Sequence, residues 1–415
     1  MSGARKTKVL LRRQQTQSSM PKSIKKPGIL VLGASGGVAQ PVLQILSKYR
    51  ELFSSLVLID RDNRVIHSRY IDHKKLKYTF IRENFTENTI KKVIKDTVDK
   101  YEVSIVLDLT DQNTLPILFA ADSLGLNYLN CSLNSEEGSM SRFVDSMKSF
   151  SNHFTNSVHV LSMGMNPGIA NHLIVKGVKE YGVPLEFVEI EYDSGMPRID
   201  SGKPFITWSK KQFLNEAVES GAGYCGPDGI YVELEEKAID TLIDTKEFLE
   251  PIKKLDIYPM GMLVSHDEVI TMSRILEIPG RFIYAIHPLS LDRMKKLLKD
   301  GKPVNETEII FEENTLIPLD GSDCIGVWLK YPDKDVCYYI DIEHSEIKGT
   351  SATLFMVAVG VVAGLLDLLK NPILENGVYS ALDLNNDNFL TITSQHIKIQ
   401  KKILLKGKIL QKTRN

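Results

Sequence analysis

The sequence predicts an α/β protein in which a Rossmann-type, doubly wound parallel sheet carries an inserted α+β domain. Over residues 28–165, short apolar strands alternate with segments whose apolar residues recur at helical spacing, and a glycine-rich turn joins the first strand to the first helix. Alternating units of this kind form a parallel sheet covered by helices on both faces. The alternation stops beyond Met165, which indicates that a second domain begins there.

The predicted NAD-binding domain, residues 28–165, opens with a strand, a glycine turn and a helix. Residues 29–32 are apolar, the turn runs from Gly33 to Ala39, and apolar residues at helical spacing follow. The second strand, residues 56–59, ends at Asp60. The other elements expected here are the helix 86–100, the strand 104–109, the helix 115–124, the strand 127–132, a helix near 139–150 and the strand 158–163.

Residues 166–349 are predicted to form the α+β domain for substrate binding and dimerisation. The segment shows one or two helical patterns and several short runs in which apolar and polar residues alternate, as in half-buried strands. The strands expected from these runs are 187–192, 261–265, 269–273 and 336–342.

The chain is expected to return to the NAD-binding domain over residues 350–395. The run 352–369 is apolar and long enough to cross a membrane. It contains Asp367, however, and the sequence has no second run of this kind, so a buried helix on the nucleotide-binding sheet is the favoured interpretation. We therefore expect no membrane partner.

Both ends of the chain are basic. Residues 1–27 contain eight lysines and arginines and no carboxylate, which is typical of a disordered tail. A transit peptide is the alternative, since such peptides are also poor in acids and contain serine. Residues 396–415 are interpreted as a basic C-terminal tail. The expected location is the cytoplasm.

Charge and cysteine content exclude several classes of function. The net charge is -1, which gives no reason to expect a nucleic-acid partner. The four cysteines are widely spaced with no C-x-x-C pair, and the nine histidines contain no H-x-x-x-H pattern. Neither a disulfide framework nor a metal site is therefore expected.

The glycine turn predicts a dinucleotide site. Its G-x-x-G-x-x-A pattern leaves the backbone bare where a pyrophosphate approaches a helix N-terminus, whose N–H groups favour anions. Asp60 then stands where a carboxylate accepts the ribose hydroxyls of NAD and repels the extra phosphate of NADP. NAD is the expected cofactor, although Arg61 and Arg64 keep NADP open, and the alternative is a Rossmann-like fold that binds another nucleotide or none. The cofactor-binding residues expected are Gly33, Ser35, Gly36, Gly37, Val38, Asp60, Asp108 and Thr110.

The segment 205–216 contains one of the two tryptophans. Ser209 and Gln212 have the spacing of a capping box, which makes Trp208 the residue before the cap and lets it pack on Phe213 as a hydrophobic staple. On this interpretation Trp208 only sets the angle at which the helix starts. The alternative is that it faces a ligand together with Glu216, one turn past Phe213.

Several segments occur in an order that resembles a known family. The chain is similar to homospermidine synthase of the bacterial, NAD-dependent type, within the saccharopine dehydrogenase-like superfamily. The resemblance covers about residues 29–380. It is carried by GMNPG at 164–168, TWS at 207–209 with Phe213 and Glu216, GMLVSHDE at 261–268, YAIHP at 284–288, and the apolar helix 352–372.

The resemblance implies an aminoalkyl transferase. Tightly bound NAD oxidises a diamine, usually putrescine, to an imine; a second amine displaces ammonia, and the stored hydride reduces the new imine to homospermidine. It also implies diamine partners such as putrescine and spermidine, and a homodimer. The site must be closed, because water would hydrolyse the imine.

The resemblance also implies roles for five residues. Glu191 and Glu216 match positions that hold substrate ammonium groups, and Trp208 matches a cation-binding tryptophan. Asn166 matches a polar residue near the nicotinamide and is expected to contact both the cofactor and the reacting amine. His287 would accept a proton from the attacking amine.

Most of these residues have a plainer alternative. Glu189, Glu191 and Asp193 alternate along one strand, so they form either a solvated face or an acidic wall. Asn166 precedes a proline, where asparagine often forms turns. His287 is either a proton acceptor or an ordinary buried histidine.

The sequence departs from the family pattern at two places. Asn134, Ser135 and Glu136 stand where the family has an acidic residue, proline and tryptophan, so a carboxylate is missing unless Glu136 or Glu137 replaces it. The loop after Glu216 is also shorter than in the family. Both changes affect the expected diamine slot and leave the amine pair open.

Two other functions stay open. An opine-type reductase related to saccharopine dehydrogenase would need an arginine pair to hold a carboxylated substrate. Arg198, Arg274 and Arg281 are available but scattered. A non-catalytic nucleotide-binding protein that senses redox state is the third possibility.

Overall fold

Two sheets form the framework of the protein. The computed structural model describes residues 26–134, 144–145, 149, 151–300, 304–305, 307–309, 318–373 and 375–406. The predicted N-terminal tail and most of the helix expected near 139–150 lie outside these residues, as do Ser135, Glu136 and Glu137.

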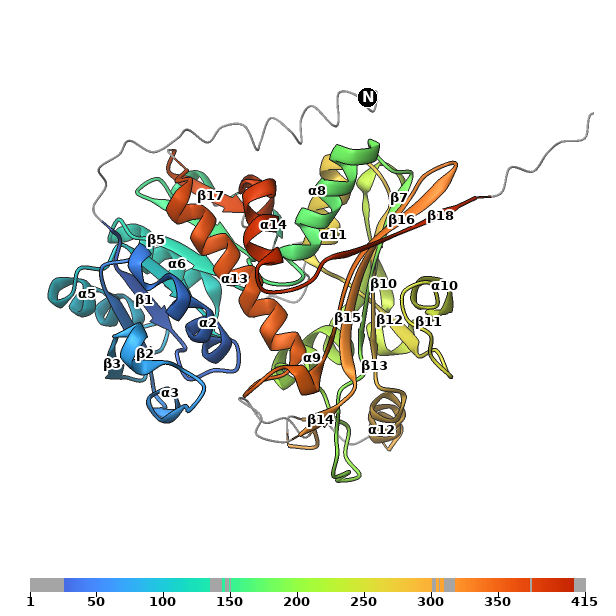
Figure 1. Ribbon diagram of the computed structural model, residues 1–415, viewed down its shortest axis with the longest axis horizontal. Coiled ribbons are helices and arrows are strands. Elements are labelled where there is room, and N and C mark those ends of the chain that lie inside the picture. The colour runs from blue at the N-terminus through green and yellow to red at the C-terminus, as the bar shows by residue number, and fades with distance from the viewer. Residues whose placement is uncertain are drawn as a thin grey trace, which may run out of the picture.

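The first sheet is parallel throughout and has the order β17-β6-β5-β4-β1-β2-β3 within the described residues (Figure 1). The strand order reverses between β1 and β4, and ligands of doubly wound folds bind in the crevice at the carboxyl ends of the strands beside such a reversal. The predicted Rossmann-type sheet is therefore confirmed. Its strands are β1 (Ile29–Leu32), β2 (Leu56–Asp60), β3 (Thr79–Arg82), β4 (Ile105–Asp108), β5 (Asn127–Asn130), β6 (Val158–Leu161) and β17 (Gly377–Ser380).

Helices cover this sheet, as the alternating pattern predicts. The strands β1 and β4 are buried along their whole length, because helices on both faces exclude water from a parallel sheet. The helices in the Rossmann order are α2 (Ala39–Leu46), α5 (Ile90–Lys100) and α6 (Thr114–Ser123), with short helices α3 (Arg64–His67) and α4 (His73–Leu76) after β2.

One long apolar helix, α13 (Ala352–Lys370), runs between the two sheets (Figure 1). By length and composition it is the one described helix that could cross a membrane, but 83% of its most apolar window is buried inside the protein. It packs against α2 and against α14 (Asn386–Ser394). After α13 the chain adds β17 to the edge of the first sheet beside β6.

The second sheet is mixed and belongs to the inserted domain. Its described strands run β10-β9-β13-β7-β15-β16-β18, and β12 joins β13 to β11 at the side. The strands are β7 (Glu186–Asp193), β9 (Gly221–Cys225), β10 (Tyr231–Lys237), β11 (Leu242–Asp244), β12 (Met260–Val264), β13 (Gly280–Ile286), β15 (Ser322–Lys330), β16 (Lys334–Glu343) and β18 (Gln400–Leu405); a separate pair is β8 (Met196–Pro197) with β14 (Leu319–Asp320).

This domain has more helix than the sequence patterns indicate. The strand expected at 269–273 is wrong, since those residues lie inside α11 (Asp267–Leu276). Val269, Ile270 and Met272 are buried together, which fits helical rather than alternating spacing. The other helices are α8 (Ile169–Tyr181), α9 (Lys210–Leu214), α10 (Lys246–Leu249) and α12 (Pro288–Lys299).

The C-terminal segment is not simply a tail. Within the predicted tail 396–415, residues 400–405 form β18, which pairs antiparallel with β16 at the edge of the second sheet (Figure 1). Because of Lys401 and Lys402, the segment resembles a charged tail in the sequence. Lysines also occur on edge strands, where they prevent further strand pairing. Residues 407–415 lie outside the described part of the chain.

Candidate functional site

A cavity of about 390 Å³ lies between the carboxyl ends of the first sheet and the inserted domain. Its lining changes in character from one end to the other. The outer end is formed by the glycine turn and the residues after β2 and β4, and the inner end by acids and aromatic rings of the second domain. The predicted site residues that line it are Gly33, Gly36, Gly37, Val38, Asp60, Thr110, Asn166, Glu191, Trp208 and Glu216.

The glycine turn has the geometry expected of a dinucleotide loop. Gly33 has a φ of +75°, and a Cβ at this position would lie 2.9 Å from the carbonyl oxygen of Leu109. A Cβ on Gly37 would lie 2.8 Å from Leu354 at the start of α13. Because Gly33 and Gly37 have no side chains, the turn after β1 can approach the end of β4 and the start of α13 closely at the mouth of the cavity.

Asp60 ends β2 at the outer end of the cavity. Its carboxylate accepts hydrogen bonds from the backbone N–H groups of Ser35 and Asp62, both at 2.8 Å, which fix its position. Of the two nearby arginines that line the cavity, Arg64 is ion-paired with Asp62 at 2.9 Å. Glu83 contributes a second carboxylate to this end.

Two predicted cofactor residues lie behind the lining instead of in it. Ser35 is buried, and its hydroxyl donates to the carbonyl oxygen of Asp62. Asp108 is also buried and accepts hydrogen bonds from Thr110 and from the Tyr128 hydroxyl. Burial raises the pKa of Asp108 above its ordinary value. Neither side chain lines the cavity, so the structure does not bring these two residues into the site as predicted. Asp108 instead holds Thr110, which does line the cavity.

The alternating acids of β7 form a buried wall. Glu189, Glu191 and Asp193 are 0%, 4% and 2% exposed, so the solvated-face alternative is excluded. Glu191 lines the cavity and accepts a hydrogen bond of 2.8 Å from the Asn166 side-chain amide. Burial raises the pKa of Glu191 to about 8. At neutral pH this carboxyl group is therefore mostly protonated until a cation approaches it.

Trp208 packs on Phe213 and also lines the cavity. Its ring meets Phe213 edge to face at 6.3 Å between centroids, which is the predicted staple. The indole also lines the cavity, and its Nε1–H donates to the Tyr284 hydroxyl at 2.7 Å. An indole face beside buried carboxyl groups attracts organic cations.

The capping box is only half formed. The Ser209 hydroxyl accepts from the Gln212 backbone N–H, as predicted. The Gln212 side chain instead donates to Asn134 Oδ1 at 2.6 Å, across the cavity mouth. Helix α9 is thereby attached to the loop after β5.

Glu216 reaches the cavity through a distortion of its helix. The segment Asn215–Glu219 is a π-helical turn directly after α9, with the Ser220 N–H bonded to the Asn215 carbonyl oxygen. Turns of this type often occur at functional sites, because the extra residue redirects a side chain. Burial raises the pKa of Glu216 to about 7.

His266 lines the cavity, although no role was predicted for it from the sequence. Its Nδ1 contacts Glu268 at 2.5 Å, and its Nε2 lies 3.9 Å from Glu216. Burial disfavours the imidazolium, but Glu268 and Glu216 outweigh burial and raise the pKa of His266 to about 10. The ring is therefore charged and bound to Glu268. The segment SHDE could have indicated this, because it places His266 next to two acids, Asp267 and Glu268, that form the first turn of α11.

Two more buried acids, Asp267 and Glu189, lie close to Glu268. Asp267 accepts from the Ser162 hydroxyl at 2.6 Å, and burial raises the pKa of Asp267 to about 7. Glu189 is fully buried, and burial together with the neighbouring Glu268 raises the pKa of Glu189 well above its ordinary value. His266, Asp267 and Glu268 offer ligand atoms within 4.8 Å of one another, but they bond to each other and to Ser162. We assign them to the electrostatics of the wall.

His287 does not reach the cavity. It is the N-cap of α12, where its Nδ1 accepts from the Leu289 N–H at 3.2 Å. A ring nitrogen used in this way satisfies an N–H group at the helix start. The structure therefore does not place His287 among the cavity residues, where its predicted role as proton acceptor for the amine would require it.

Comparison with known proteins agrees with this arrangement. Residues 29–158 match the model of the saccharopine dehydrogenase NADP binding domain. The crystal structure of homospermidine synthase from Legionella pneumophila in complex with NAD is similar, with a TM-score of 0.73, 15% identity, and coverage of 95% of this chain and 94% of that chain. The chain has a saccharopine dehydrogenase-like fold.

The second structural relative has the same fold. Saccharopine dehydrogenase (L-Glu forming) from Saccharomyces cerevisiae gives a TM-score of 0.62 at 15% identity, covering 91% of this chain and all of that chain. No curated protein matches the sequence. The matched domain and the fold support a nicotinamide cofactor, NAD or NADP.

Proposed function

We propose that the protein is an NAD-dependent aminoalkyl transferase of the homospermidine synthase type. The observation that carries this proposal is the inner end of the cavity, where Glu191, Glu216 and an indole face lie directly beyond the dinucleotide loop. Putrescine is a dication at neutral pH, so its site must offer negative charge or aromatic faces.

The charge balance of the cavity favours an amine. Among the described lining residues, the arginines Arg61 and Arg64 lie at the outer end near Asp60, and His266 at the inner end is bound to Glu268. An entering ammonium group would ionise Glu191 and Glu216 and replace the protons that they hold. This exchange offsets the desolvation of both partners.

Each side chain has a definite task in the proposed reaction. Bound NAD would accept and return a hydride. Asn166 holds Glu191 in place through its amide, so that Glu191 faces an amine beside the nicotinamide end. Glu216 and the Trp208 face hold the other ammonium group, and His266 with Glu268 keeps Glu216 in its orientation. The proposed reaction requires that water be excluded while the imine is present, because water would hydrolyse it.

The carboxylated-substrate alternative lacks its anion clamp. Each of the three arginines available to it is already ion-paired on the surface, and none of them lines the cavity. The pairs are Arg198 with Asp320 at 2.8 Å, Arg274 with Asp145 at 2.7 Å and Arg281 with Glu186 at 3.1 Å. Within the described residues we therefore favour the amine substrate.

The departures from the family pattern bear on the choice of amines. Asn134, which replaces the family carboxylate, lines the cavity and donates to the Thr110 carbonyl oxygen at 3.1 Å. An amide binds an ammonium group more weakly than a carboxylate does. We propose that this position makes the enzyme differ from its relatives in the amine it accepts. The homodimer and the cytoplasmic location stay predictions.

The test is turnover with a catalytic amount of NAD. The purified protein with putrescine should yield homospermidine and ammonia by mass spectrometry without net NADH, and the matched variant Glu191→Gln should not. Net NADH consumption with a keto acid and an amine would instead support the opine-type reductase. Bound NAD without any turnover would support the redox sensor.

A further inference from the structure

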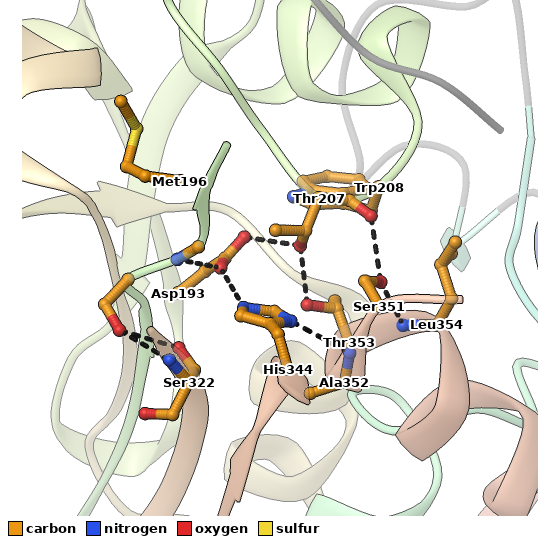
Figure 2. Close-up of polar contacts among 12 residues, drawn as sticks. Asp193, Met196, Thr207, Trp208, Ser322, His344, Ser351, Ala352, Thr353 and Leu354 are labelled. Carbon is orange, nitrogen blue, oxygen red and sulfur yellow. Dashed lines mark hydrogen bonds and ion pairs between the residues drawn. The ribbon is translucent and has the colours of Figure 1, made fainter. Parts of the chain in front are cut away.

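A second buried polar network lies beside the cavity, at the start of α13 (Figure 2). It joins the end of β7 to His344, which follows β16, and to Thr207, which precedes Trp208. The network centres on Asp193, which is 2% exposed. Its carboxylate accepts from the Thr207 hydroxyl at 2.6 Å and from the Gly195 N–H at 3.0 Å, and His344 Nε2 faces it at 3.4 Å.

The hydroxyl groups in this network have a fixed direction. Thr207 uses its proton to bond Asp193, so at the 2.6 Å contact between the two threonines Thr353 must be the donor. A lone pair of the Thr353 hydroxyl can then accept a proton from the cavity side. Since Thr353 lines the cavity, a chain of two hydroxyls leads from the cavity to a buried carboxylate (Figure 2).

The chain starts at the reacting end of the cavity. Leu354, the next residue, contacts the Gly37 position of the dinucleotide loop, while Glu191 and Asn166 line the same cavity. Asp323, opposite Asp193 on β15, is a second buried carboxyl group beside the Thr353 hydroxyl. Burial, with Glu191 and Asp193 nearby, raises the pKa of Asp323 well above its ordinary value, and its hydrogen bond with Thr353 acts in the opposite direction. The raised pKa makes Asp323 a weaker competitor for the Thr353 proton than an ionised carboxylate would be.

We propose that Thr353 and Thr207 form a proton relay that carries the proton of the substrate ammonium group to Asp193 and later returns it. This proposal rests on the proposed function and assigns a further step to the same site. In the oxidation half, R-CH2-NH3⁺ loses a proton to the relay and a hydride to NAD, which leaves R-CH=NH2⁺. In the reduction half, the secondary imine takes back the hydride, and the amine product takes back the proton.

Exchange of the amines in between needs no net proton. The entering R'-NH3⁺ displaces NH4⁺ from the imine, and the charge is unchanged. The proton on Asp193 therefore waits inside the protein for as long as the hydride does. A buried acceptor reached through hydroxyls suits this storage, because it has no direct contact with water.

The competing account is that the network only anchors α13. The anchor, however, has its own bonds: the Ser351 hydroxyl caps the helix at Leu354 and donates to the Thr207 carbonyl oxygen, and His344 Nδ1 accepts from the Ala352 N–H. None of these bonds uses the Thr353 hydroxyl. A substitution that removes the Thr353 hydroxyl therefore tests the relay and leaves these three anchoring bonds in place.

The test is the rate of NADH formation in a single turnover, with putrescine and the NAD-loaded protein. Thr353→Val, which keeps the shape, should slow this step about 100-fold, within the usual range for acid–base catalysis, with little change in the dissociation constant of putrescine. Thr353→Ser, which keeps the hydroxyl, should restore the rate to within about threefold. Thr391→Val, at an exposed hydroxyl on α14, is the matched control and should behave as wild type.

The possible outcomes distinguish a failure of the proposed relay from a failure of the proposed function. An unchanged rate in Thr353→Val, or equal losses in Thr353→Val and Thr353→Ser, would overturn the relay and leave the proposed function standing. A wild-type protein that forms neither NADH nor product with any amine would overturn both. If Thr353→Val does not fold, judged by NADH binding, Thr353→Ala removes the hydroxyl without added bulk and takes its place.

Discussion

Trp208 shows at the residue scale how one side chain serves packing and recognition together. Its edge packs on Phe213 at the start of α9, and its Nε1–H is bonded to Tyr284, which leaves the ring along the cavity wall. The staple was predictable from local spacing. The contact with Tyr284, 76 positions later, follows from the position of β13 beside β7.

Substitution of Trp208 separates the two roles. We expect Trp208→Phe to keep the staple and the melting temperature within a few degrees, but to raise KM for the amine about tenfold, because the indole face and the Tyr284 bond are lost. Trp208→Ala should lose the staple as well and melt earlier. Steady-state kinetics and thermal unfolding check both. An unchanged KM in Trp208→Phe would show that the ring serves packing only.

Glu191 should make stability depend on pH. Its pKa in the folded protein, about 8, is raised above the ordinary value by burial, so the folded state holds a proton that the unfolded chain has already released. The contribution of Glu191 to stability is therefore greatest below about pH 4.5, falls as the pH rises, and is fully lost above pH 8.

The variant Glu191→Gln removes this dependence. Its unfolding free energy should equal that of wild type near pH 4.5 and exceed it by about 2 to 4 kcal/mol at pH 9. Chemical denaturation at the two pH values measures the difference. A constant difference across this range would mean that Glu191 is ionised in the folded protein.

At the element scale, the acidic wall is assembled from three separate pieces. Strand β7 contributes Glu191, the π-helical turn contributes Glu216, and the start of α11 contributes Asp267 and Glu268. Each of these pieces would place its acid differently in isolation. Packing buries these acids together, and burial raises the pKa values of Glu191, Glu216 and Asp267.

This arrangement predicts that amine binding releases protons. An ammonium group favours the ionised forms of Glu191 and Glu216, whose pKa values are raised to about 8 and about 7. The affinity for putrescine should therefore rise about tenfold or more between pH 6 and pH 8. Calorimetry in buffers of different ionisation heat measures both quantities. Proton uptake, or an affinity that is flat over this range, would contradict the wall as described.

At the scale of the whole molecule, the cavity lies where the two domains meet. The Gln212 side chain donates to Asn134 after β5, and the Ser162 hydroxyl after β6 donates to Asp267, so both contacts join the inserted domain to the first sheet. A dinucleotide at the outer end would therefore contact one domain and expose its reactive ring to the other.

Cofactor choice should appear as a difference in thermal stability. Asp60 and Glu83 line the outer end, and Arg64 is paired with Asp62, so we expect NAD to bind more tightly than NADP. NAD at 100 times its Kd should add about 2.7 kcal/mol to the unfolding free energy, with a smaller effect from NADP at the same concentration. The variant Asp60→Ala should narrow the difference between the two. A larger shift with NADP than with NAD in wild type would reverse the assignment.

Local patterns in the sequence determined much of this protein. The apolar run of β1, the glycine turn after it, Asp60 at the end of β2 and the cap at Ser209 all depend on contacts within a few residues, and such contacts can be predicted from spacing. The alternating acids of β7 could be assigned to one face for the same reason. What spacing could not decide was whether that face meets water or the cavity.

Only the tertiary structure decided which distant residues meet. His266 lines the cavity and His287 caps a helix, although both follow apolar strands in the sequence. The strand β18 pairs with β16 across some sixty residues, and Thr353 reaches Asp193 only through Thr207. The physical reason is that burial, which raises the pKa of Glu191 and directs the threonine hydroxyls, depends on how the sheets and α13 pack, and no local pattern records that packing.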